Sequence, residues 1–113
     1  MSTIFKKIID KEIKADIVYE NKDILCFKDV NPVSPIHLLI IPKKQISTVN
    51  DIKKEDKVLI GEMFIVAQKV AKTLNIDEKG YRLIVNCNED AGQTVFHLHM
   101  HLLAGRKFIW PPG

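Results

Sequence analysis

Histidine and apolar residues alternate over residues 95–103, and this alternation constrains the fold more than any other feature of the chain. Three of the four histidines lie there at every second position: His97, His99 and His101. Successive side chains of a β-strand point to opposite faces, so the spacing predicts a strand with its imidazoles in one row, about 7 Å apart. The other face would be apolar and would anchor the strand to a core; it carries Leu98, Met100 and Leu102.

Three imidazoles on one face of a strand have no evident structural purpose. They would repel one another if protonated, and they would be costly to bury if neutral and unpaired. Imidazole has an unperturbed pKa of about 6.5, which lets it exchange protons near neutral pH. The row therefore indicates chemistry, and two kinds of chemistry are open at this point.

Metal binding is the first, because His-x-His on a strand is a good zinc pair and His37 could add a nitrogen to those of the row. Nucleophilic attack on phosphorus is the second, with one imidazole as nucleophile while its neighbours orient it and hold phosphate oxygens. The preceding loop, Gly92-Gln93-Thr94, favours this second chemistry. Its glycine lets backbone N–H groups approach an anion and its threonine adds a hydroxyl, and a metal site needs neither feature.

The bulk properties are those of one soluble domain: 113 residues, 46% hydrophobic and 27% charged, with a formal net charge of +3. The basic pairs Lys43-Lys44 and Lys53-Lys54 are too short for a nucleic-acid-binding stripe, so no nucleic acid is expected as a partner. Cys26 and Cys87 form no CxxC pair and are expected to be buried, reduced thiols. Neither a signal peptide nor a membrane span is evident, so the expected location is the cytoplasm, without membrane contact.

Changes in hydrophobic period along the chain predict an α+β fold, an antiparallel sheet of about five strands with one short and one long helix. The expected strands are residues 17–20, 24–28, 37–41, 81–85 and 95–103, and the expected helices are residues 3–10 and 51–74. Two prolines make residues 29–35 an ordered loop, and residues 86–93 form a second loop rich in turn-forming residues.

The histidine segment resembles the motif His-φ-His-φ-His-φ-φ, with φ apolar, of the histidine triad (HIT) superfamily. Further segments are similar to its Hint branch: Thr3-Ile4-Phe5, Phe27-Lys28-Asp29-Val30, Pro35-Ile36-His37, Ile41-Pro42-Lys43-Lys44, Gly80-Tyr81-Arg82 and Trp110-Pro111-Pro112-Gly113. The resemblance covers nearly the whole chain and implies one HIT domain, residues 1–113. It also implies a homodimer with a joined sheet, in which the tail 106–113, with Trp110, reaches the partner's site.

The activity that this resemblance implies is that of a purine nucleoside phosphoramidase without a cofactor, which cleaves a P–N bond to release AMP and an amine. His99 would be the nucleophile, His101 would contact the phosphate, and His97 with His37 would fix the tautomer and orientation of His99. Two alternatives stay open: a dinucleoside polyphosphate hydrolase of the same superfamily, and a nucleotide-binding or interaction module whose catalysis is incidental. The sequence does not distinguish adenine from guanine.

The same resemblance assigns residues to the nucleotide. Asn86, Gly92, Gln93 and Thr94 correspond to the phosphate-binding loop, with the Thr94 hydroxyl assisting the amine leaving group. Asp29 would accept hydrogen bonds from both ribose hydroxyls. An apolar slot for the base would be lined by Phe5, Ile8, Phe27, Val30 and Ile40.

The chain departs from the Hint pattern at a few positions. Thr94 stands where serine is usual, which keeps the hydroxyl but adds a methyl group that stiffens χ1. Many bacterial relatives carry a Cys-x-x-Cys zinc motif where this chain reads Thr3-Ile4-Phe5-Lys6, and Gln45 stands where a histidine is common. No metal is therefore expected.

Overall fold

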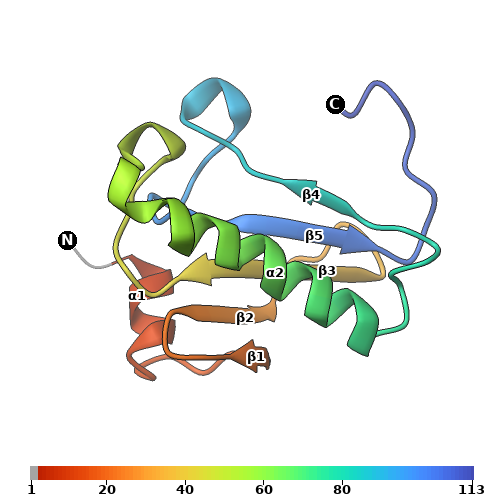
Figure 1. Cartoon of the computed structure of the whole chain (residues 1–113). Coiled ribbons are helices and arrows are strands. Elements are labelled where there is room, and N and C mark those ends of the chain that lie inside the picture. The colour runs from red at the N-terminus through yellow and green to blue at the C-terminus, as the bar shows by residue number, and fades with distance from the viewer. Residues whose placement is uncertain (1–2) are drawn as a thin grey trace.

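A five-stranded antiparallel sheet in the order β1-β2-β3-β5-β4, crossed on one face by a long helix, organises the computed structural model (Figure 1). The structure describes residues 3–113. The elements are α1 (Ile4–Ile9), β1 (Ile17–Glu20), β2 (Ile24–Lys28), β3 (Ile36–Pro42), α2 (Lys57–Thr73), β4 (Arg82–Ile84) and β5 (Met100–Ala104). The predicted α+β class, with five strands and one long and one short helix, is confirmed. Within residues 3–113, no helix combines the length and apolarity needed to cross a membrane.

The first helix and the first hairpin follow from local capping chemistry. Thr3 caps α1, since its hydroxyl accepts a hydrogen bond from the Lys6 N–H at 3.1 Å. In the β1–β2 turn, the Asn21 side-chain oxygen accepts from the N–H groups of Asp23 and Ile24, at 2.9 and 2.8 Å. An Asx turn of this kind reverses the chain without needing a glycine.

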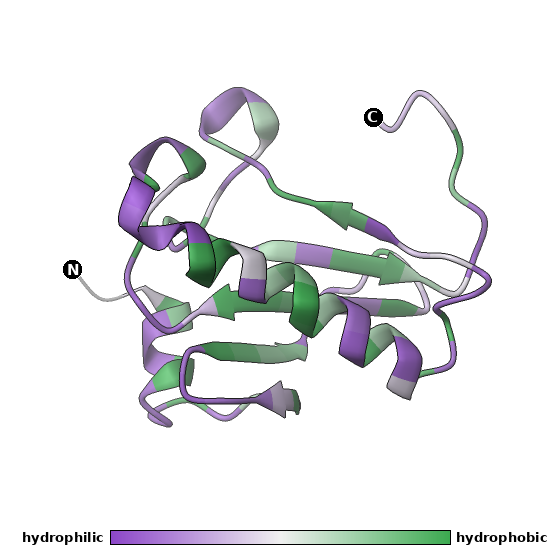
Figure 2. Ribbon diagram, viewed as in Figure 1, coloured by the Kyte–Doolittle hydropathy of each residue, from purple (hydrophilic) through white to green (hydrophobic). Residues whose placement is uncertain are grey.

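The sheet separates two apolar clusters, because alternate residues of each strand point to opposite faces. The α2 side holds the larger cluster, to which β3 contributes Leu38 and Ile40. The α1 side holds a smaller one, to which β3 contributes Leu39 and Ile41. Along α2, apolar and polar residues alternate in patches (Figure 2), and five of its residues are buried: Met63, Val66, Ala67, Val70 and Ala71.

The long helix is shorter than the sequence predicts. Two 3₁₀ turns, Val49–Asp51 and Lys54–Asp56, come first, and α2 begins at Lys57. Carboxylates explain both turns: Asp51 accepts from the Thr48 N–H at 3.1 Å, and Asp56 accepts from the Lys53 N–H at 2.9 Å. Side-chain bonds of this kind hold the backbone in tight turns, which compete with a regular helix.

The histidine strand is also shorter than predicted, since β5 begins only at Met100. The ladder between β3 and β5 runs from the pair Ile36–Ala104 to the pair Ile40–Met100. Beyond it the partner strand reaches Pro42, which has no N–H to donate to a ladder. His97 and His99 therefore lie in an irregular segment that leads into β5.

Candidate active site

All three imidazoles of the row lie on the α1 side of the sheet, as the alternation predicts. The Phe5 ring packs edge-on against His97 and His99, with centroids 6.3 and 5.0 Å away. The rings of His99 and His101 are 5.0 Å apart, so the row is tighter than an ideal strand would make it. Leu98, Met100 and Leu102 point the other way into the α2-side core, as predicted. His97 is fully buried, His99 is 8% exposed and His101 is half-buried.

His99 has a defined tautomer because of one backbone contact. Its Nδ1 lies 2.7 Å from the His97 carbonyl oxygen. A carbonyl can only accept a hydrogen bond, so Nδ1 carries the proton and donates it. Neutral His99 therefore keeps a lone pair on Nε2, which is the form that a nucleophilic imidazole needs.

A second chain of hydrogen bonds sets the tautomers of His37 and His101. The Val33 N–H donates to His37 Nδ1 at 3.1 Å, so the proton of neutral His37 is on Nε2. That Nε2 lies 2.9 Å from His101 Nδ1 and donates to it. The proton of neutral His101 is consequently on Nε2, where it can be donated to an anion.

Burial keeps three of these histidines neutral near pH 7. It lowers the pKa of His37 against the opposing charge of Asp29, and it lowers the pKa of His97 against the opposing hydrogen bond to the Pro42 carbonyl. For His101, burial first and then the neighbouring His99 and His37 lower the pKa to about 4. The hydrogen-bond directions derived above for the neutral rings therefore apply at neutral pH.

His97 and His37 support the site differently from the prediction. His97 acts on His99 through its carbonyl oxygen, while its own ring bonds elsewhere: Nε2 donates to the Pro42 carbonyl at 2.7 Å, and Nδ1 lies 3.0 Å from the Gln45 side-chain oxygen. His37 contacts His101, and among the described residues no hydrogen bond joins His37 to His99. The sequence did not predict the contributions of Val33, Pro42 and Gln45. Val33 and Pro42 act through backbone groups, which every residue type has, and Gln45 was noted only as a departure from the histidine common in the family.

Asp29, His37 and His101 are the one group of the described residues whose potential metal-ligating atoms converge, all within 4.8 Å of one another. The Asp29 carboxylate lies 3.4 Å from His37 Nε2 and also accepts from the Asn31 N–H at 2.8 Å. Coordination through His37 Nε2 would move its proton to Nδ1 and break the bond from Val33, whereas metal-bound histidines normally donate from their second nitrogen. The arrangement fits a proton-ordered network better than a metal site.

The predicted phosphate-binding loop is internally bonded. Gly92 and Gln93 donate their N–H groups to the carbonyls of Glu89 and Asn88, at 2.9 and 3.1 Å. The buried Gln93 side chain bonds to the Asn88 N–H and to the carbonyls of Ser47 and Val95. The Gln93 side chain and N–H therefore brace the loop, and contact of Gln93 with the nucleotide stays a prediction.

Two other residues of this loop keep free polar groups. Thr94 is exposed, and within residues 3–113 no hydrogen bond involves its hydroxyl or its N–H. Asn86 is half-buried, and in the same part of the chain no hydrogen bond involves its amide side chain. Both remain available to an anion.

The predicted base slot needs one correction. Phe5, Ile8 and Phe27 belong to the α1-side cluster, but Ile40 is fully buried in the α2-side cluster. Since adjacent residues of β3 point to opposite faces, the site-side residue is Leu39, which pairs with His101. Val30 is 87% exposed. An open cavity of about 500 Å³ is lined by Ile8, Lys11, Ile13, Lys14, Ala15, Asp16, Ile17 and Val30.

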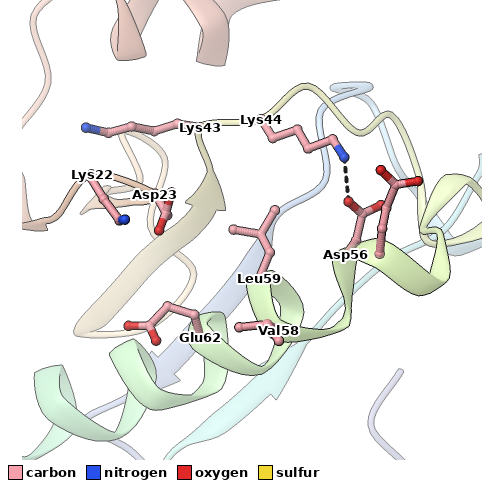
Figure 3. A pocket seen from close by; sticks show the side chains of 9 residues that line it. Lys22, Asp23, Lys43, Lys44, Asp56, Val58, Leu59 and Glu62 are labelled. Atoms are coloured by element: carbon pink, nitrogen blue, oxygen red, sulfur yellow. Dashed lines mark hydrogen bonds and ion pairs between the residues drawn. The ribbon is translucent and has the colours of Figure 1, made fainter.

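Another cavity, of about 600 Å³, lies at the start of α2 and contains no imidazole. It is lined by Lys22, Asp23, Lys43, Lys44, Glu55, Asp56, Val58, Leu59 and Glu62. Figure 3 shows the Lys44 ammonium turned toward Asp56, an ion pair of 2.6 Å. Its charges of both signs are paired or face water, so it offers no nucleophile and no convergent set of donors.

Comparisons with known proteins match the sequence and the fold of this chain. Residues 10–108 match the family described as HIT domain. An uncharacterized HIT-like protein of Synechocystis is 50% identical over 111 residues, covering 98% of this chain and 96% of its own length. Among solved structures, a HIT family hydrolase of Legionella pneumophila is 48% identical with a TM-score of 0.97, covering 99% of this chain and 100% of its own. A histidine triad nucleotide-binding protein of Candida albicans is 33% identical with a TM-score of 0.81, covering 89% and 73%.

Proposed function

This chain belongs to the HIT domain family, and from that premise we propose that it is a purine nucleoside phosphoramidase. The proposed reaction is hydrolysis of the P–N bond of a purine nucleoside 5′-phosphoramidate to a nucleotide such as AMP and an amine. One observation carries the proposal: His99 has its Nδ1 proton held by the His97 carbonyl, and the Nε2 lone pair is left for attack. The family membership and the hydrolase and nucleotide-binding relatives support the same reading.

The first step is transfer of the nucleotidyl group to the protein. The lone pair of His99 Nε2 forms a bond to the α-phosphorus, and the P–N bond of the substrate breaks with its electron pair going to the amine. The amine takes a proton from solvent through the Thr94 hydroxyl. The Nε2–H of His101 donates a hydrogen bond to the phosphate oxygens, and this stabilises the charge that develops there.

Hydrolysis of the intermediate is the second step. A water molecule forms a bond to phosphorus and loses a proton to solvent, while the bond from phosphorus to His99 Nε2 breaks. The imidazole carries positive charge while it is bound to phosphorus, and the His97 carbonyl stabilises this charge through the Nδ1 proton. The nucleotide leaves, and His99 returns to its starting tautomer.

The nucleoside is proposed to lie along the α1 flank of the site. Asp29 follows β2, its carboxylate is oriented by the Asn31 N–H, and its two oxygens suit the two ribose hydroxyls. The cavity lined by Ile8 and Val30 includes the residue that follows Asp29 in the chain, and its apolar side chains would contact the purine. These features support a purine nucleotide as the substrate and do not distinguish adenine from guanine.

A homodimer is part of the proposal. β4 is an edge strand with one unpaired side, and an unpaired edge can accept a strand from a second chain. On α2, Phe64 and Ile65 are 51% and 46% exposed, which is unusual for such large apolar residues unless a partner covers them. The tail runs beyond β4 (Figure 1), and its residue Trp110 is 82% exposed. We propose that Trp110 contacts the site of the partner in the dimer.

The unpaired Cys26 and Cys87 support a reducing location such as the cytoplasm.

The test is to trap the intermediate and compare substrates. The protein is mixed with an AMP–amine conjugate, quenched in acid-free denaturant, and searched by mass spectrometry for a nucleotide on His99. Rapid cleavage of the conjugate with little cleavage of diadenosine polyphosphates is the expected result. Preference for the polyphosphates would replace the proposal with dinucleoside polyphosphate hydrolysis. If the protein binds nucleotide but cleaves neither the conjugate nor the polyphosphates, it is a nucleotide-binding module and not an enzyme.

A further inference from the structure

The carbonyl that orients His99 lies outside the regular sheet. It belongs to His97, three residues before β5 begins at Met100. Ladder hydrogen bonds therefore do not hold it, and a carbonyl at 2.7 Å from His99 Nδ1 needs some other support to stay in place. That support comes from the segment after β3.

Three hydrogen bonds connect residues 96–98 to residues 42–46. Two have backbone carbonyls of this segment as acceptors: the Leu98 N–H donates to the Ile46 carbonyl at 2.6 Å, and His97 Nε2 donates to the Pro42 carbonyl at 2.7 Å. In the third, the Gln45 side-chain nitrogen donates to the Phe96 carbonyl at 3.1 Å. The Gln45 oxygen also lies 3.0 Å from His97 Nδ1, but neutral His97, whose proton is on Nε2, has none on Nδ1 to donate to it.

Gln45 therefore holds the peptide unit that precedes His97 through its hydrogen bond to the Phe96 carbonyl, and its side chain lies beside the His97 ring. This peptide unit leads directly to the carbonyl that accepts from His99 Nδ1. Gln45 is itself exposed, which means that it can be replaced without opening the core.

We propose that Gln45 is a positioning residue for the nucleophile: its amide nitrogen holds the Phe96 carbonyl, in the peptide unit before His97, so that the His97 carbonyl keeps His99 in the tautomer with Nε2 free. This inference rests on the proposed function for its catalytic consequence. Its structural part, the tautomer and orientation of His99, does not depend on any substrate. The two parts can therefore fail separately.

The test compares Gln45→Met with Gln68→Met. The first substitution keeps the length of the side chain and removes the hydrogen bond to Phe96, and the second makes the same change at an exposed position of α2. We expect the rate of nucleotidyl transfer to His99 to fall about tenfold in Gln45→Met, with KM for the nucleotide substrate unchanged, since a misplaced nucleophile affects the reacting geometry more than binding. Gln68→Met should match the wild type.

A spectroscopic measurement without substrate provides the second readout. In ¹⁵N imidazole NMR spectra, wild-type His99 is expected as the Nδ1–H tautomer alone, and Gln45→Met is expected to add a second tautomer. Gln45→Glu keeps an oxygen opposite His97 Nδ1 and adds a charge there. It should therefore raise the pKa of His97, against the lowering effect of burial.

The outcomes separate the two claims. If Gln45→Met leaves both the His99 tautomer and the transfer rate unchanged, the role of Gln45 is refuted. If the wild type cleaves no phosphoramidate but Gln45→Met still disturbs the His99 tautomer, the proposed function fails and the positioning role stands. A fall in transfer rate together with a mixed tautomer supports both.

Discussion

The two faces of the sheet are built from the same strands and serve different ends. On the α2 side, a helix of 17 residues covers a buried cluster made only of apolar residues and Cys26. On the α1 side, a helix of six residues covers only part of the face, and four histidines lie beside the smaller apolar cluster. His99 keeps 8% of its surface exposed there. The comparison indicates that one face supplies stability and the other supplies reactive, hydrogen-bonded side chains.

The largest expected effect is on the imidazole face. Substitution of the nucleophile, His99→Gly, should lower kcat/KM for an AMP–amine conjugate by at least about a thousandfold, because the covalent route is lost. The free energy of unfolding should also fall, since the buried ring packs against Phe5 and His101 and glycine adds backbone freedom to the unfolded chain, so activity is compared under conditions where the variant is folded. Stopped assays with product separation measure the first quantity and urea titration the second. Cleavage that persists undiminished in the variant would show that another residue is the nucleophile.

On the opposite face, Leu102→Ala should act on stability alone. Leu102 is fully buried under α2, and its truncation is expected to lower the free energy of unfolding by about 3 kcal/mol. The matched change on the other face is Leu39→Ala, whose side chain lies beside His101. We expect urea unfolding to report a similar loss for both variants, but activity at low temperature to fall only for Leu39→Ala. Equal loss of activity in both would mean that the faces are not separable.

The pH dependence of stability should come from the imidazole face. The folded-state pKa of His101 is lowered to about 4, so between its ordinary pKa near 6.5 and pH 4 the unfolded chain binds a proton that the folded chain does not. Stability is therefore unaffected above about pH 6.5 and falls as the pH drops toward 4, by about 1 kcal/mol per pH unit. Urea titrations across this window measure the slope. His101→Leu should reduce it, and an unchanged slope would assign the effect to other groups.

The smallest expected effect concerns the loop that borders the imidazole face. Thr94→Ser removes only a methyl group, and we expect kcat to change less than about threefold. Thr94→Val keeps the shape but removes the hydroxyl, and kcat should fall about tenfold because the leaving amine loses its proton path. The difference should be larger for amines of high basicity, which need the proton most. Equal kcat values for Thr94→Val and the wild type would exclude a role for the hydroxyl.

Much of the fold could be predicted because the spacing of apolar residues within short segments indicates where the helices and strands lie. The hairpin strand Ile24–Lys28 matches its predicted bounds, and the spacing of apolar residues identified the buried stripe of α2. The errors lie where side-chain hydrogen bonds or a missing N–H overrode the pattern. Asp51 and Asp56 tightened the start of the long helix, and Pro42 ended the ladder before it reached His99.

For the site, residue identity and alternation were enough to find the imidazoles but not their partners. Ile40 was misplaced because a fully apolar strand gives no sign of which residues face which side. The bracing role of Gln93 could not be predicted, because a turn-rich loop has the same sequence pattern whether its amides are free or bonded to one another.

The sequence by itself determined that three imidazoles share one face of a sheet, that the reverse face is apolar, and which family the chain resembles. Only the tertiary structure decided which nitrogen of each ring carries the proton. For His97 and His101, the hydrogen bonds that set this join residues 55 and 64 positions apart, and the partners are a backbone carbonyl and the His37 ring. For His99 and His37 the partners lie 2 and 4 residues away in the chain, but they are backbone groups, and no residue type predicts them. A two-residue period predicts which face of the sheet a side chain lies on. The tautomer of a histidine depends on which donors and acceptors lie beside its two nitrogens in the folded chain.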